Sequence, residues 1–191
     1  MRDIITAHIE RSLRVKQDAL KNQELLNNIE QCAERLLSCI KDNGTVYIAG
    51  NGGSACDSLH FCEELVARYK RERPGIKAHH LIDPAILTCW SNDYSYDLVF
   101  QRQVETFCTE KDLLFLLSTS GNSQNVIKAA ETAKDKGTAV IALTGESGGA
   151  LAPLADIALK VPSNHTAHIQ EMHITILHLL CEIVEQELFE S

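Results

Sequence analysis

Three times along this chain, a short apolar segment runs into a turn rich in glycine, serine or threonine. The apolar segments cover residues 46–49, 113–117 and 139–143, and helical spacing of apolar residues follows the first two turns. Such runs are typical of strands buried on both faces, and strands that alternate with helices pair in parallel through right-handed crossovers. With shorter strands predicted near 79–82 and 157–161, the pattern predicts an α/β fold: a doubly wound five-stranded parallel sheet flanked by helices.

Both ends of the chain are predicted to be helical. Apolar residues recur at helical spacing from Ile4 to Ile40, which indicates one long or two shorter amphipathic helices, and a final helix is expected over about 165–188. A helix ahead of an α/β unit has to bury its apolar stripe, and packing against a second copy is a common solution. We therefore expect a single domain, 1–191, with an N-terminal helical segment, 1–43, for oligomerisation and an α/β core with the C-terminal helix, 44–191.

Composition argues against several classes of function. The formal net charge of −8 disfavours broad binding to nucleic acid or to an acidic membrane. The seven cysteines are scattered without a C-x-x-C pair, so we expect buried reduced thiols rather than disulfides or a zinc knuckle. Charged residues interrupt the N-terminus, and no apolar run reaches membrane length. A cytoplasmic protein without nucleic-acid or membrane partners is expected.

Two polar turns should lie at the same edge of the sheet, where the carboxyl ends of parallel strands meet. Residues 50–54 contain three glycines, which let a backbone approach a ligand closely, and Ser54, a good helix cap. Residues 118–123 offer four hydroxyl groups, which fits a phosphate ester, although such turns are most often plain turns. The first turn also satisfies a dinucleotide fingerprint, but the acidic residue expected about 20 positions later is missing, since Asp83 comes later still.

A metal or acid–base site is indicated by the histidines. His60 and Glu64 share one helix face close after the first turn, so binding and chemistry should be neighbours. The last helix carries several histidines beside Gln170 and Glu171; a helical histidine is more often packed or solvated, but their number favours a functional site. Gln170 and His178 are about 12 Å apart along a regular helix, at the limit of what two side chains can close onto one ion.

The basic run at residues 68–75 is interpreted as a solvated loop from which Arg68 could reach a phosphate. Asn92 and Asp93 follow a predicted helix, where such residues usually cap or turn the chain.

These motifs together resemble the sugar-isomerase (SIS) family, and within it the bacterial phosphoheptose isomerases. The resemblance covers nearly the whole chain in order. It is carried by residues 50–54, 60–65, 68–69, 92–93, 118–123 and 169–173, and by His178.

The resemblance implies an aldose–ketose isomerase that converts sedoheptulose 7-phosphate to D-glycero-D-manno-heptose 7-phosphate, the first step towards ADP-heptose for lipopolysaccharide. It also implies one zinc ion per subunit and a homotetramer with active sites at subunit interfaces. The alternative is a non-catalytic SIS protein that binds sugar phosphates or the bacterial replication initiator. Such proteins lose the acid–base residues, so the presence of Glu64 and His178 favours the enzyme.

Carried over position by position, the resemblance implies three groups of site residues. The phosphate would be held by Ser118, Thr119, Ser120 and Ser123. The sugar would contact Asn51, Gly52, Gly53, Ser54, Glu64, Asn92, Asp93 and Gln170, with Arg68 assisting. Zinc would be held by His60, Glu64, Gln170 and His178, of which Glu64 is also the implied base and His178 the implied acid. His168 stands where many members have arginine, so a fixed cationic contact there is not implied.

Overall fold

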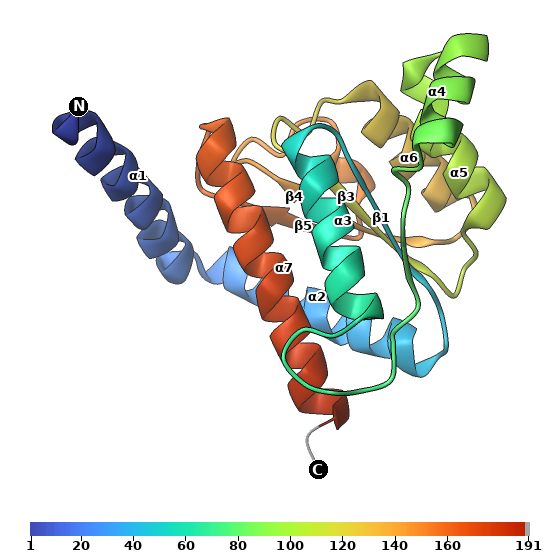
Figure 1. Ribbon diagram of the computed structural model, residues 1–191, viewed down its shortest axis with the longest axis horizontal. Helices are drawn as coiled ribbons and strands as arrows, with labels where there is room; N and C mark the ends of the chain where they lie inside the picture. The colour runs from blue at the N-terminus through green and yellow to red at the C-terminus, as the bar shows by residue number, and fades with distance from the viewer. Residues whose placement is uncertain (190–191) are drawn as a thin grey trace.

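The computed structural model describes residues 1–189, in which a parallel sheet lies between two groups of helices (Figure 1). The strands are β1 (Val46–Gly50), β2 (Ala78–His80), β3 (Leu113–Ser118), β4 (Ala139–Thr144) and β5 (Ile157–Lys160). The helices are α1 (Arg2–Lys21), α2 (Gln23–Lys41), α3 (Gly53–Val66), α4 (Pro84–Asp93), α5 (Val99–Phe107), α6 (Gln124–Asp135) and α7 (Thr166–Phe189), with short 3₁₀ helices η1 (Tyr96–Leu98) and η2 (Ala152–Leu154).

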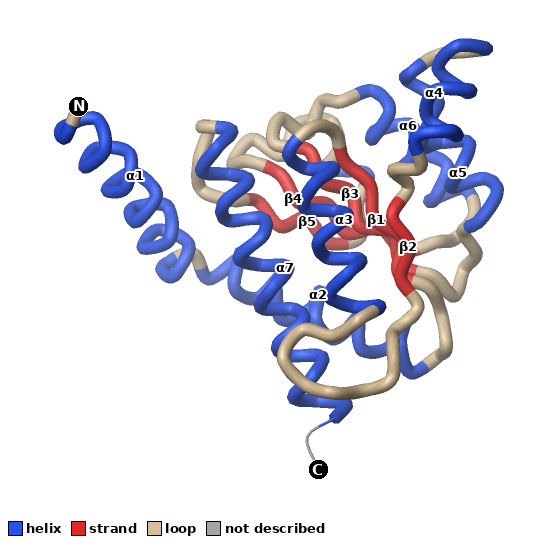
Figure 2. The backbone as a smooth tube through the Cα atoms, in the orientation of Figure 1, coloured by secondary structure: helices blue, strands red, loops and turns tan. Residues whose placement is uncertain are grey.

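The sheet order is β2-β1-β3-β4-β5, with every neighbouring pair parallel (Figure 2). The predicted doubly wound five-stranded sheet is therefore confirmed. In its register Gly50 pairs with Leu117, and Ser118 pairs with Thr144. This register brings the turns after β1 and β3 to one edge of the sheet, as the sequence predicted.

Two hydrophobic layers cover the two faces of the sheet. Phe115 and Leu117 of β3 point into a layer formed with α2, α3 and α7, while Leu114 and Leu116 point into a layer formed with α5 and α6. All six residues of β3 are buried, as are all six of β4, which explains their continuous apolar sequences. Figure 1 shows α3 and α7 side by side over the first face.

The N-terminal segment forms two helices rather than one. Asn22 separates them, and its side chain caps α2 by accepting a hydrogen bond from the Leu25 backbone N–H at 3.0 Å. α2 packs into the core of the α/β unit, and the oligomerisation role expected for 1–43 stays a prediction. α1 contacts α7 but projects from the body (Figure 1), and its apolar residues remain exposed, with Ile4 at 74% and Ile9 at 62%.

None of the seven cysteines, all of which lie in the described part of the chain, is paired in a disulfide. Their expected burial holds for five of them and is wrong for Cys56 and Cys89, which lie on exposed faces of α3 and α4. Among the described residues, no helix combines the length and the apolar character needed to cross a membrane.

Candidate active site

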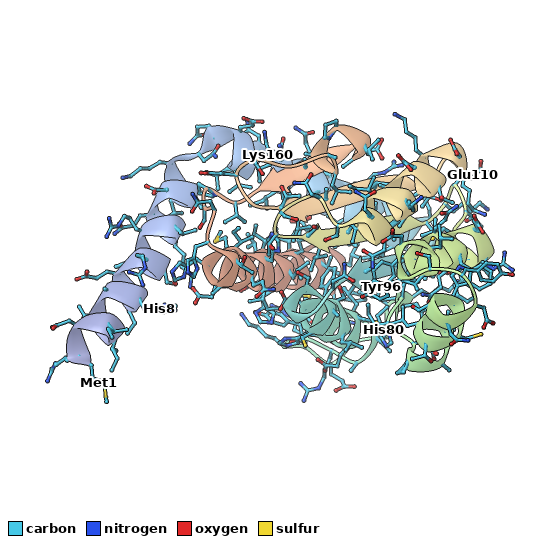
Figure 3. All side chains as sticks on the ribbon, turned by 90° about the horizontal axis from the view of Figure 1, so that it is seen from above. Met1, His8, His80, Tyr96, Glu110 and Lys160 are labelled. Atoms are coloured by element: carbon cyan, nitrogen blue, oxygen red, sulfur yellow. The ribbon has the colours of Figure 1, made fainter. Side chains whose placement is uncertain are left out.

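The turn after β1 is tied to the neighbouring polar turn by side-chain amides. Asn51 and Asn125 exchange a pair of hydrogen bonds of 2.9 and 3.0 Å, and the Tyr96 hydroxyl donates to Asn51 Oδ1 at 2.6 Å. Asn125 is buried in the first turn of α6, and Tyr96 begins the short helix η1 (Figure 3). Gly52 has a φ of +56°, and nothing lies within 4 Å of a Cβ placed there, so its backbone is open to a ligand.

The turn after β3 places two hydroxyl groups together. Ser118 Oγ and Ser123 Oγ are 3.2 Å apart, and the Ser123 hydroxyl does not cap α6 although it occupies the N-cap position. Thr119 and Ser120 line a cleft of about 250 Å³ that also reaches Gly145, Glu146 and the start of α7. Free N–H groups at the start of α6 and the positive end of its dipole favour an anion here.

A second polar centre lies further along α3. His60 Nε2 is 3.2 Å from Glu64 Oε1, and His178 Nε2 is 3.5 Å from His60 Nε2 and 3.9 Å from Glu64 Oε1. Four tetrahedral zinc ligands at about 2.0–2.1 Å from the ion lie roughly 3.4 Å from one another. The three donor atoms fit that spacing, and they are the imidazole and carboxylate types that bind zinc. This group can hold a metal ion.

Tyr69 completes the wall of this centre. Its ring stacks on that of His178, with centroids 5.6 Å apart and planes at 26°. Glu64 is the least exposed member of the three ligands, with 14% of its side chain accessible. The centre is thus a partly enclosed carboxylate between two imidazoles.

Gln170 lies elsewhere in this chain. A Cβ on Gly53 would be 2.5 Å from Gln170 Nε2, so the amide packs against the first residue of α3. Gly53 precedes His60 by two helical turns, or about 10 Å along the axis. Three of the four predicted metal ligands come together, and the role of Gln170 as the fourth stays a prediction.

The glycine turn and the metal-ligand centre are also well separated. α3 runs back from the carboxyl edge of the sheet, so Gly53 and Glu64 are about 16 Å apart along the helix. Eleven helical residues lie between the turn and Glu64. The sequence-based expectation that binding and chemistry are neighbours stays a prediction.

The remaining predicted sugar contacts make their polar contacts away from both turns. Arg68 follows the end of α3 and faces Glu72, with Nε and Oε2 4.0 Å apart and both side chains exposed. Asn92 donates to Asp93 Oδ1 at 2.8 Å on exposed α4. Their roles in binding stay predictions.

The basic run at 68–75 is largely the solvated loop that the sequence suggested, since all its residues except Tyr69 and Arg73 are exposed. Arg73 is buried and departs from that prediction. Arg73 and Glu185 form an ion pair at 3.1 Å, with side chains only 1% and 2% exposed. Glu185 also accepts hydrogen bonds from the backbone N–H groups of Tyr69, Lys70 and Arg71 at 3.0–3.1 Å. Sequence reasoning missed Glu185 although it lies on the apolar stripe of α7, eight residues after Leu177 and four after Cys181, where a charged residue needs a buried partner.

The histidines of α7 separate into different environments. Only His178 joins His60 and Glu64. His173 is buried and its Nε2 faces the Thr144 carbonyl oxygen at 3.2 Å, and burial lowers its pKa to about 4. His165 and His168 lie near the start of the helix, on the side of α1.

The parallel sheet and the two polar turns at its carboxyl edge define the class of protein. The family model described as SIS domain matches residues 9–145, and the chain belongs to the SIS family. Its full-length relatives within that family are phosphoheptose isomerases. The protein of that name from Leptospira biflexa is 48% identical over 189 residues, which are 97% of this chain and 96% of the relative. The one from Aneurinibacillus thermoaerophilus is 43% identical over 192 residues, 100% of this chain and 97% of the relative.

A solved structure agrees with these matches. The phosphoheptose isomerase from Francisella tularensis superposes with a TM-score of 0.92 at 39% identity, covering 97% of this chain and 98% of that one.

Proposed function

We propose that this protein is an aldose–ketose isomerase that converts sedoheptulose 7-phosphate to D-glycero-D-manno-heptose 7-phosphate, the reaction that opens ADP-heptose synthesis. The observation that carries the proposal is the convergence of Glu64 with His60 and His178, from two helices, in a chain with full-length phosphoheptose isomerase relatives. The free thiols are consistent with action in the cytoplasm.

The chemistry requires groups of these types. Interconverting a ketose and an aldose moves a proton between adjacent carbons through an enediol, which needs a base, an acid for the oxygen and stabilisation of negative charge. Glu64 is the proposed base, because its carboxylate is partly enclosed and lies 3.9 Å from His178. His178 is the proposed acid, and the stacked ring of Tyr69 holds its imidazole plane.

The proposed cofactor is zinc, one ion at this centre in each subunit, held by His60, Glu64 and His178 with Gln170 as the fourth ligand. When bound, zinc would supply stabilisation of the negative charge that develops on the sugar oxygen. A carboxylate that binds zinc is a weaker base. One oxygen of Glu64 would therefore bind the ion while the other is left to accept the proton.

The phosphate of the substrate is proposed to lie at the turn after β3. Ser118, Thr119, Ser120 and Ser123 would donate their hydroxyls, supported by N–H groups at the start of α6. The sugar would then extend past Asn51, Gly52, Gly53 and Ser54, with Asn92, Asp93, Gln170 and Arg68 as further contacts.

We propose a homotetramer in which neighbouring subunits complete each active site. The separation of about 16 Å between Gly53 and Glu64 along α3 supports a site that uses the turns of one subunit and the metal-ligand centre of another. The exposed apolar face of α1, with Ile4, Ile9 and Leu13, supports burial against another copy. Light scattering at micromolar concentration should give four chains per particle, and a stable monomer would contradict the shared site.

Glu64→Gln tests the reaction. The amide keeps the size of the side chain but cannot accept the proton, so turnover should collapse while sugar phosphate still binds in calorimetry. Deuterium from solvent should enter carbon-bound positions of the sugar with the wild-type protein and not with the variant. Glu63→Gln, at the exposed neighbouring position, is the matched control and should keep wild-type turnover.

Two results would count against the proposal. Near-wild-type turnover of Glu64→Gln would place the base elsewhere. A wild-type protein that binds sugar phosphate and converts none would favour the non-catalytic SIS alternative, which the retained Glu64 and His178 disfavour.

A further inference from the structure

A second cluster of metal-binding side chains joins α1 to α7. His8 Nε2 lies 3.8 Å from Glu171 Oε1, and His168 Nδ1 lies 3.4 Å from Glu171 Oε2. The two imidazole rings are 4.7 Å apart between centroids. Figure 3 shows His8 on the side of α1 that faces α7. We propose that His8, His168 and Glu171 bind a second divalent transition-metal ion of the zinc class, which cross-links α1 to the body of the protein.

The spacing of the donor atoms is the first observation that supports the proposal. One ligand atom from each of the three residues lies within 4.8 Å of the others. The His8 and His168 nitrogens lie 3.8 and 3.4 Å from different oxygens of Glu171. A small side-chain adjustment would bring one nitrogen from each ring and one carboxylate oxygen to the roughly 3.4 Å spacing of tetrahedral zinc ligands. Two imidazoles and one carboxylate leave a fourth position for water.

The environment of the His168 side chain is the second observation that supports the proposal. The side chain is 2% exposed, and its Nε2 is buried with no hydrogen-bond partner among the described residues. Its Nδ1 faces Glu171, and the ring packs against that of His8. The packing therefore fixes the ring with Nδ1 directed at the cluster, which lowers the entropy cost of using this atom as a ligand.

The Glu171 carboxylate is also positioned to bind a metal ion. The Ser12 hydroxyl, also on α1, donates a short hydrogen bond to Glu171 Oε2. That bond, together with the contacts to His168 and His8, fixes the orientation of the carboxylate between α1 and α7. Carboxylate ligands held by such outer hydrogen bonds are typical of protein metal sites.

This cluster is separate from the centre at His60. Glu171 and His178 are seven residues apart on α7, or about 10 Å along the axis, and their partners lie on different helices. A metal ion at His8 would fix the angle of the helix whose apolar face is exposed.

Metal counting tests the proposal. Chelator-stripped protein is titrated with Zn²⁺ alone, and bound metal is measured by elemental analysis after desalting. The His60→Ala protein, in which the first centre is disrupted, should retain one ion per chain, and His60→Ala with His8→Ala should retain none. His79→Ala in the same His60→Ala background removes another exposed imidazole and should leave the count at one.

Two further measurements separate a metal site from a simple ion pair. Ser12→Ala in the His60→Ala background should weaken zinc binding by about 10- to 100-fold, since it removes the hydrogen bond that orients a ligand. Zinc should slow amide hydrogen exchange in residues 2–21 of the His60→Ala protein and leave exchange unchanged once His8 is also replaced. Equal zinc content with and without His8, or no zinc in the His60→Ala protein, would overturn the proposal.

Discussion

Replacing Glu185 by glutamine should destabilise the protein more than any nearby change of charge. Glu185 accepts four hydrogen bonds, three from backbone N–H groups and one from Arg73 Nε, at 3.0–3.1 Å. Each of its oxygens takes two of them. In Glu185→Gln one oxygen becomes an NH₂ group, so two of the four donors lose their acceptor and the buried Arg73 loses its counter-ion.

The expected cost follows from these contacts. Hydrogen bonds to charged groups contribute about 1.5–3 kcal/mol each, and breaking a buried ion pair costs about 3–5 kcal/mol in total. We therefore expect the free energy of unfolding to fall by about 3–5 kcal/mol. Glu182→Gln is the matched control one turn earlier on α7, because its 3.1 Å pair with Lys70 is exposed and screened by solvent, so the free energy of unfolding should change little.

Urea unfolding at a fixed protein concentration, in excess chelator, measures both variants without differences in metal or subunit binding. The backbone that Glu185 holds includes Tyr69, which stacks on His178, so kcat/KM should also fall in folded Glu185→Gln protein and not in Glu182→Gln. A Glu185→Gln protein within 1 kcal/mol of wild type would refute this prediction, because it would mean that the buried Arg73 and the backbone N–H groups do not depend on the carboxylate.

Three further predictions concern single positions. Ser123→Ala should raise KM for the sugar phosphate about 10- to 100-fold, because one hydrogen bond to a charged group is lost. An unchanged KM in steady-state assays would mean that the turn after β3 does not bind the phosphate. Gly121→Ala should lower the thermal midpoint and weaken phosphate binding in calorimetry, because φ is +66° and a Cβ would meet the Gly148 carbonyl oxygen at 2.1 Å. Burial lowers the pKa of His173 to about 4, so its contribution is present above the unfolded value of about 6.5 and is lost as pH falls from 6.5 to 4. That loss is about 3 kcal/mol, and urea unfolding of His173→Gln across the same range should lack it.

The local sequence pattern was enough to predict the strands and helices and to place the polar turns at the carboxyl edge of the sheet. Runs such as 113–117 read as buried strands because both faces of a parallel sheet are covered, and the polar turns had to follow them at the carboxyl edge. His60 and Glu64 could be paired from the sequence because residues four apart share a helix face. The interpretation of 68–75 as a solvated loop holds for most of the segment but missed the burial of Arg73, because local charge does not show that a carboxylate 112 positions away pairs with it.

By itself the sequence determined the α/β architecture, the two polar turns and the pairing of His60 with Glu64 on one helix face, since each depends on periodicity within one element. Only the tertiary structure decided how the histidines of α7 divide. His178 meets α3, His173 packs on β4 and His168 meets α1, because the direction of each side chain depends on which element packs against that turn of the helix. The same packing brought Asn125 and Tyr96 to Asn51, contacts between segments whose spacing along the chain carries no signal of their meeting.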